Sequence, residues 1–95
     1  MTTEYITVNE CCVYHHIETS FLYSLQHAGL IQITEVETVQ VIALEQLPEL
    51  EQYIRWHYEL DINTEGMETI RHLLKKMGTL QDEVRLLKDK LKFYE

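Results

Sequence analysis

The amino-acid sequence predicts a mainly α-helical fold with a small β-hairpin wing: a winged helix-turn-helix domain followed by a long C-terminal coiled-coil helix. Two helical patterns joined by a tight turn occupy residues 13–31 (VYHHIETSFLYSLQHAGLI). A β-branched stretch of period two follows at residues 31–43, and the C-terminal third carries an apolar heptad pattern. We therefore expect a winged helix-turn-helix domain at residues 1–62 and a helical dimerisation segment at residues 63–95.

The helix-turn-helix begins with a short helix that we expect over about residues 8–15. Thr7 lies three residues before Glu10, which is the spacing of a capping box. His16 and Ile17 then form the turn, with Ile17 buried. The apolar face of this first helix consists of Val8, Cys11, Cys12 and His15.

The second helix is expected to begin near Thr19 or Ser20, because a hydroxyl group there can accept a bond from a free backbone N–H. Gly29 ends this helix, since glycine adopts a positive φ at the lowest cost. The apolar residues of the helix recur at helical spacing and form one face: Phe21, Leu22, Leu25 and Ala28.

Residues 31–43 (IQITEVETVQVIA) change to period two and predict a two-stranded hairpin that turns near residues 35–38. No Asn-Gly pair marks the turn. The expected inward positions are Ile31, Ile33, Val39, Val41 and Ala43.

A third helix is expected to start near Glu45, because Pro48 is tolerated only in the first turn. Residues 61–63 end it, and Asn63 is expected to cap the helix that follows. The apolar face of the third helix consists of Leu47, Leu50, Ile54, Trp56 or His57, and Leu60.

The final segment has the strongest periodicity in the chain, and Gly78 is a possible bend or helix boundary within it. Its apolar residues are spaced alternately by three and four, the seam of a coiled coil. Two chains joining along this seam are favoured over one helix packing on its own domain. Glu83 and Lys88 fall at g and e positions, which suits a parallel pair, but an antiparallel pair stays open. The predicted dimerisation residues are Ile70, Leu73, Met77, Leu80, Val84, Leu87, Leu91 and Tyr94.

The charge is unevenly distributed along the chain. The formal net charge is −8, and all eight Lys and Arg residues lie between Arg55 and Lys92. Residues 1–54 contain eight glutamates and no Lys or Arg, so they carry the whole net charge. This half is either a solvated acidic surface or a face that attracts a basic protein.

No pattern of a catalytic, cofactor or membrane site is present. Cys11, Cys12, His15 and His16 include Cys/His pairs at i, i+4, a spacing that can chelate zinc, but their side chains cannot all reach one ion. We expect core cysteines, surface histidines, no metal, no cofactor and no enzymatic activity. The sequence has no apolar run near the ~18–20 residues that span a bilayer, so we expect a cytoplasmic protein without a membrane partner. Trp56, beside Arg55, is either a core residue or part of a contact surface.

The order of these elements resembles the MerR-like winged-helix class. The residues that carry the resemblance are Ile17, Leu22, the AGLI of residues 28–31 and the HYELDINTEGM of residues 57–67. DNA-binding members of that class have an arginine followed by tyrosines in the second helix and basic residues in the wing. Tyr23 stands at the arginine position here, the wing is acidic, and His16 replaces the turn glycine. DNA is therefore not the expected partner, because phosphate neutralisation needs Lys or Arg.

The chain also resembles the chaperone-modulator CbpM-like family in its short length, in NECCVYHHIETSFLYSLQHAGLI and in RWHYELDINTEGM. That resemblance implies a MerR-type fold that binds the J-domain of a DnaJ/CbpA-type co-chaperone and restrains its stimulation of DnaK. J-domains present a basic helix, which suits an acidic partner. The alternatives are a MerR-like DNA-binding transcriptional regulator and a dimerisation module without a dedicated target. The predicted partner-binding residues are Glu18, Tyr23, Glu35, Glu37 and Glu49.

Overall fold

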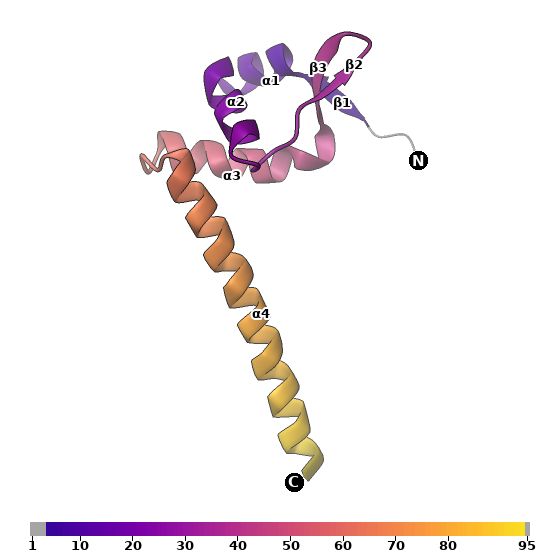
Figure 1. The fold of residues 1–95 in the computed structure, drawn as a ribbon, viewed down its shortest axis with the longest axis vertical. Helices are drawn as coiled ribbons and strands as arrows, with labels where there is room; N and C mark the ends of the chain where they lie inside the picture. The colour runs from indigo at the N-terminus through magenta and orange to yellow at the C-terminus, as the bar shows by residue number, and fades with distance from the viewer. Residues whose placement is uncertain (1–3, 95) are drawn as a thin grey trace.

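A computed structural model of the chain describes residues 4–94 and confirms the predicted fold class (Figure 1). A helix-turn-helix and a small sheet lie above a third helix, and a long fourth helix descends from this domain. The elements are β1 (Tyr5–Thr7), α1 (Val8–His15), α2 (Thr19–His27), β2 (Thr34–Val36), β3 (Val39–Ala43), a 3₁₀ turn η1 (Leu44–Gln46), α3 (Leu47–Tyr58) and α4 (Thr64–Tyr94).

Helix α1 begins at the predicted capping box. The Thr7 hydroxyl oxygen accepts a hydrogen bond from the Glu10 backbone N–H at 3.1 Å, and it donates one to the Glu10 carboxylate at 2.8 Å. The helix ends at His16, which takes the left-handed conformation with φ 56°. The left-handed conformation costs a residue with a side chain about 1–2 kcal/mol. Hydrogen bonds across the turn offset this cost, such as the one that the Ile17 N–H donates to the Cys12 carbonyl at 3.0 Å.

Helix α2 starts at Thr19, as predicted, but the predicted capping bond to Thr19 or Ser20 is not formed. Its N-cap residue is Glu18, and no side chain bonds to the free N–H groups there. The predicted apolar face is confirmed, with Phe21, Leu22 and Leu25 buried and Ala28 packed against the core. Gly29 follows with φ 77°, as predicted for the end of this helix.

The predicted two-stranded hairpin is confirmed as β2 and β3, which turn at Glu37 and Thr38. Strand β1 pairs with the other edge of β3 and completes a three-stranded antiparallel sheet of order β1-β3-β2. Of the expected inward residues, Ile31, Ile33 and Val41 are buried, whereas Val39 is 45% exposed. Ile42, which the alternating pattern placed outward, is fully buried in the core. Since β1 pairs along β3, with Ile6 opposite Ile42, strand β3 is the covered central strand.

Helix α3 begins two residues later than predicted, after η1, with Pro48 in its first turn as expected. Its buried residues are Leu50 and Tyr53. Trp56 is partly buried against the core, which supports the core interpretation of this residue. Leu60, expected on the apolar face, is 63% exposed because it lies beyond the end of the helix.

Helix α4 is capped by Asn63, whose side-chain oxygen accepts a hydrogen bond from the Gly66 N–H at 2.8 Å. The helix is continuous through Gly78, so the suggested boundary there was wrong. Arg71 donates a hydrogen bond to the Gly29 carbonyl at 3.1 Å and ties α4 to the end of α2.

The long helix leaves the domain almost at once. It has 31 residues, about 46 Å at the usual rise, and Met67 is its buried residue. The Cα radius of gyration is 17.9 Å, whereas a compact domain of this length has about 12 Å. Most of α4 therefore has no packing partner within the described chain.

Candidate functional site

The surface that a helix-turn-helix offers to a partner is the outer side of α2 and the neighbouring wing. In α2 the exposed positions include Ser20, Tyr23, Ser24 and His27, and strand β2 is exposed along its length. No Lys or Arg occurs before Arg55, so neither α2 nor the wing carries a permanent cation. The surface is polar and acidic.

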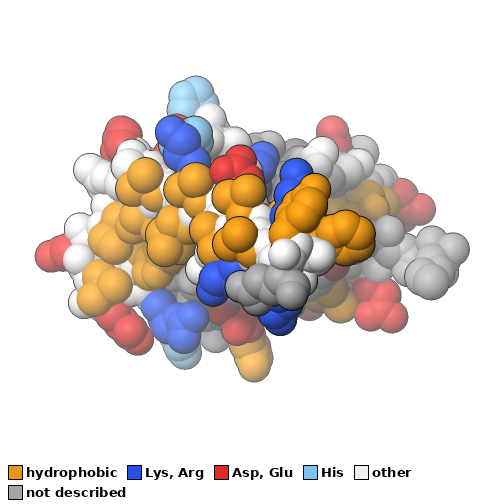
Figure 2. Space-filling view, turned by 90° about the horizontal axis from the view of Figure 1, so that it is seen from below, with side chains coloured by type: hydrophobic (Ala, Val, Ile, Leu, Met, Phe, Trp, Pro, Cys, Tyr) orange, Lys and Arg blue, Asp and Glu red, His pale blue; other side chains and the backbone are white. Residues whose placement is uncertain are grey.

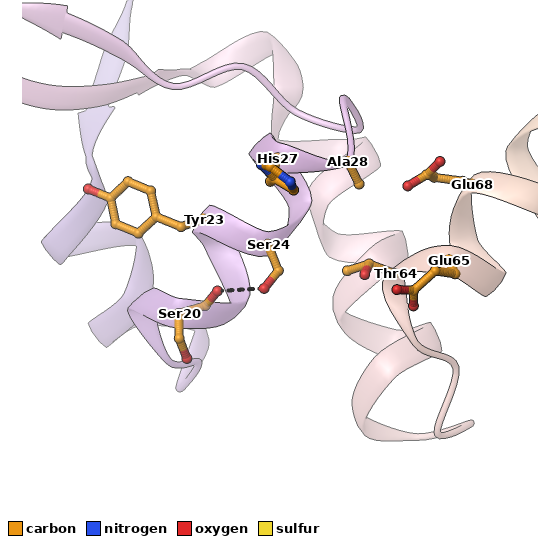
Figure 3. Close-up of a pocket in the computed structure, with 8 residues that line it drawn as sticks. All are labelled: Ser20, Tyr23, Ser24, His27, Ala28, Thr64, Glu65 and Glu68. Atoms are coloured by element: carbon orange, nitrogen blue, oxygen red, sulfur yellow. Dashed lines mark hydrogen bonds between the residues drawn. The ribbon is translucent and has the colours of Figure 1, made fainter.

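A cleft of about 640 Å³ separates α2 from the start of α4 (Figure 3). One wall is made by α2 with Ala28, and the other by the first two turns of α4. Figure 3 shows Ala28 and Glu68 facing each other across the gap. The lining residues are Ser20, Tyr23, Ser24, His27, Ala28, Thr64, Glu65 and Glu68.

Tyr23 stands between this cleft and a second hollow on the wing side. It is 40% exposed, and Figure 3 shows its ring pointing away from α4. The second hollow has a volume of about 320 Å³ and contains no charged side chain. Its lining consists of Thr7, Val8, Asn9, Thr19, Tyr23, Thr38, Val39 and Gln40. The exposed aromatic ring thus borders an acidic cleft on one side and a neutral hollow on the other.

The tip of the wing is a tight turn between Val36 and Val39, which are paired. Glu37 and Thr38 form it with φ values of 49° and 66°. Such two-residue turns prefer Asn or Gly, because side chains with positive φ are strained. The turn holds Glu37 at the exposed end of the hairpin. Within residues 4–94 its side chain makes no hydrogen bond, and Thr38 bonds only to its backbone carbonyl.

The structure brings some of the predicted partner-binding residues to one region. Tyr23 and the wing line the same neutral hollow. Glu18 lines a third hollow, which shares Ser20 and Ser24 with the acidic cleft. Glu35 and Glu37 are exposed on the wing.

Glu49 is separate from that region. It is exposed on α3, in the other layer of the domain. Burial raises the pKa of the Tyr53 hydroxyl; Arg71 partly opposes this rise and Glu49 adds to it. The carboxylate of Glu49 therefore belongs to the environment of a core tyrosine under the helix-turn-helix.

Glu65 and Glu68 were missed as site residues by the sequence reasoning. Glu65 was identified only as an acidic residue in the first turn of a helix, where its negative charge interacts favourably with the helix dipole. Its position opposite α2 depends on the reversal of the chain at residues 59–63, which no local pattern encodes. The only sequence signal is the block HYELDINTEGM at residues 57–67, which fixes how α4 starts.

The Cys/His cluster does not form a metal site. The Cys11 sulfur lies 3.6 Å from His15 Nδ1, while His15 Nε2 points to a Glu51 carboxylate oxygen 3.8 Å away. Burial, and to a lesser extent the neighbouring Cys12, raises the pKa of the Cys11 thiol to about 11. The raised pKa opposes formation of the thiolate that a metal ligand requires. Among residues 4–94 no group of three or more His, Cys, Asp or Glu side chains could hold a metal ion.

The seam residues of α4 are exposed, apart from the half-buried Ile70. Their exposed fractions run from 51% at Val84 to 85% at Tyr94. Figure 2, which looks at the molecule from below, shows hydrophobic side chains gathered in a band with Lys, Arg, Asp and Glu at its edges. A soluble helix with such a stripe normally buries it against another element.

None of the helices described for residues 4–94 combines the length and the hydropathy needed to cross a lipid bilayer.

Comparison with protein families gives one match. Residues 6–89 fit the family described as MerR HTH family regulatory protein. This range includes the helix-turn-helix, the wing, α3 and most of α4. A comparison with curated proteins gives no match.

Proposed function

Because this chain belongs to the MerR HTH family of regulatory proteins, as the match over residues 6–89 shows, we propose that it is a non-enzymatic regulator that binds a basic protein through its helix-turn-helix surface. The observation that carries this proposal is the charge of that surface. Residues 1–54 contain eight glutamates and no Lys or Arg. A protein that binds DNA obtains most of its affinity by neutralising phosphates with these two residue types.

The partner is the J-domain of a DnaJ/CbpA-type co-chaperone, which the protein restrains by occupying its basic helix. Two lines of reasoning support this partner: the resemblance of the chain to CbpM-like modulators, and the charge complementarity between a basic helix and an acidic surface. The predicted contacts are Glu18, Tyr23, Glu35, Glu37 and Glu49. Tyr23 is the aromatic residue among them, and exposed tyrosines are enriched at interface hot spots.

The active form is a homodimer joined along α4. The seam from Ile70 to Tyr94 is exposed in the single chain, and a helix of this length needs a packing partner to stay ordered in water. A second copy supplies the same stripe in the same register. Two acidic domains would then be presented by one dimer.

Binding to a full-length DnaJ/CbpA-type co-chaperone over a salt series tests the proposal. We expect affinity to fall as salt rises, because opposite charges are screened. The double variant Glu35→Lys with Glu37→Lys should bind more weakly and with a smaller salt dependence. Unchanged affinity of this variant would reject the electrostatic mechanism.

The alternative function is DNA binding, which the name of the matched family favours. A mobility-shift assay with duplex DNA over the same salt series separates the two functions. Tight binding to the duplex with a steep salt slope would support the alternative, since that slope counts neutralised phosphates.

A further inference from the structure

We infer that the cleft between α2 and α4 seats cationic side chains of the basic partner, so that Glu65 and Glu68, rather than the wing glutamates, hold the complex together. This inference rests on the proposed function and assigns it a location. It adds two residues of α4 to a surface that the sequence placed on the first 54 residues.

The composition of the cleft supports a cationic occupant. Its two acidic residues lie on α4, opposite an α2 wall made of Ser24, Ala28 and neighbouring residues. Neither Glu65 nor Glu68 belongs to an ion pair within residues 4–94. A Lys or Arg stem could lie on the apolar surface of Ala28 while its charged end reaches the carboxylates. The arrangement offers both an apolar contact and charge compensation.

The cations of α4 border this cleft without filling it. Arg71 and Lys75 line the next hollow along the helix, which they share with Glu68. Arg71 is already engaged by the Gly29 carbonyl at 3.1 Å. The acidic cleft thus ends at a basic boundary, which would place the partner's cations on the Glu65 side.

The cleft stays open in the proposed dimer. If Ile70 occupies heptad position a, then Glu65 falls at c and Glu68 at f, on the side of the helix opposite the seam. A second copy joined along the seam does not cover these positions. Each dimer would therefore present two acidic clefts.

The position of a charge decides which rate it controls. Glu35 and Glu37 are exposed on the wing, and exposed rim charges mainly steer the encounter and change the association rate. Glu65 and Glu68 are also exposed, but they line a cleft with α2 as its opposite wall, where a bound cation would lose part of its water. Removing one member of such a pair mainly accelerates dissociation.

Binding kinetics with a full-length DnaJ/CbpA-type co-chaperone, at a pH near 8 where ordinary histidines are neutral, test this division. We expect Glu65→Gln with Glu68→Gln to dissociate about tenfold faster or more, with a nearly unchanged association rate. The pair Glu35→Gln with Glu37→Gln should instead slow association and leave dissociation nearly unchanged.

The matched control is Asp82→Asn with Asp89→Asn. These residues occupy f positions, as Glu68 does, whereas Glu65 is at c. The control therefore removes the same charge from the side of α4 opposite the seam, away from the cleft. The single variant Glu68→Gln lies beyond the first helical turn and avoids weakening the start of the helix. Circular dichroism verifies that each variant is folded.

If both cleft variants dissociate like the control pair while the wild type binds, the cleft assignment is wrong and the proposed function stands. If the wild-type protein does not bind the co-chaperone at all, the proposed function fails and the cleft assignment fails with it. Faster dissociation of both cleft variants, with the control unchanged, supports the inference.

Discussion

The substitution Leu80→Glu should separate the proposed dimer into single chains. Leu80 lies in the middle of the seam and is 56% exposed in the single chain. Full burial of a leucine contributes about 1.5–3 kcal/mol, so burial of the exposed remainder contributes about 1–1.5 kcal/mol per chain. Two chains per dimer give about 2–3 kcal/mol, which corresponds to a dissociation constant raised about 30- to 150-fold.

The new glutamate raises that value further, because each chain would bury a carboxylate in the apolar seam without a partner. Sedimentation equilibrium over a range of protein concentrations measures the change. Helix content should fall with the dimer, since most of α4 has no packing partner within its own chain and a long unsupported helix frays in water.

Leu86→Glu is the matched control for this experiment. Leu86 is the same residue type and is 57% exposed, but it falls at heptad position c, off the seam. The variant therefore adds the same charge to the same helix and should remain dimeric. The reasoning is refuted if Leu80→Glu stays dimeric at concentrations where the wild type does, or if Leu86→Glu separates the chains equally.

Four further outcomes concern stability and are measured by chemical unfolding at one fixed protein concentration. Gly78→Ala should stabilise the chain by about 1 kcal/mol, since its added Cβ meets no atom within 4 Å and alanine favours helices. Gly66→Ala should destabilise it despite the same propensity gain, because its Cβ would lie 2.8 Å from Ile62 Cγ2; equal effects of the two variants would contradict this. Asn63→Ala should cost about 1 kcal/mol through loss of the cap, and no loss would show that another group replaces it. Burial raises the pKa of the Cys11 thiol from 9.0 to about 11, so this thiol ionises at a lower pH in the unfolded chain than in the folded one. The free energy of unfolding should keep its full value below pH 9 and fall by about 2–3 kcal/mol as the pH rises to 11. The variant Cys11→Ala should remove most of this pH dependence.

Features set by chemistry within a few residues could be predicted from the sequence. The Thr7–Glu10 capping box, the cap at Asn63 and the positive φ at Gly29 are all as expected. Each depends on the hydrogen-bonding group or the conformational freedom of one side chain near a helix end. The apolar faces of α1 and α2 were predicted for the same reason, since their spacing alone defines them.

Features that depend on distant partners could not be predicted in this way. The pairing of β1 with β3 joins residues 5–7 to residues 41–43, which no local pattern encodes. This pairing places Ile42 in the core, at a position that the alternating pattern left outward. Glu18 precedes α2 as its N-cap without making a capping bond, so hydroxyl preference at Thr19 or Ser20 did not decide where the helix begins.

The candidate site also contains residues that the sequence could predict and residues that depend on distant parts of the chain. Tyr23, Glu35 and Glu37 were predicted because they belong to the helix and wing that the fold class defines. Glu65 and Glu68 were not, since their place opposite α2 requires the chain to reverse after α3 and return. The count of charged residues over residues 1–54 showed that this half of the chain is acidic. It could not include Glu65 and Glu68, which only the tertiary structure brings next to α2.

The scaffold and its charge carry separate information about function. The bonds that form the helix-turn-helix, such as the turn at Ile17 and the Arg71 contact with Gly29, are independent of the sign of the exposed charges. The same frame can therefore present basic residues to DNA or acidic residues to protein. The family match fixes the frame, and the proposed function assigns the choice of partner to charge. A basic variant should reveal this: replacing Glu18, Glu35 and Glu37 with lysine leaves the frame intact and should create non-specific affinity for duplex DNA with a measurable salt slope. If those replacements left the chain folded but unable to bind DNA at low salt, the proposal that charge sets the choice of partner would be wrong.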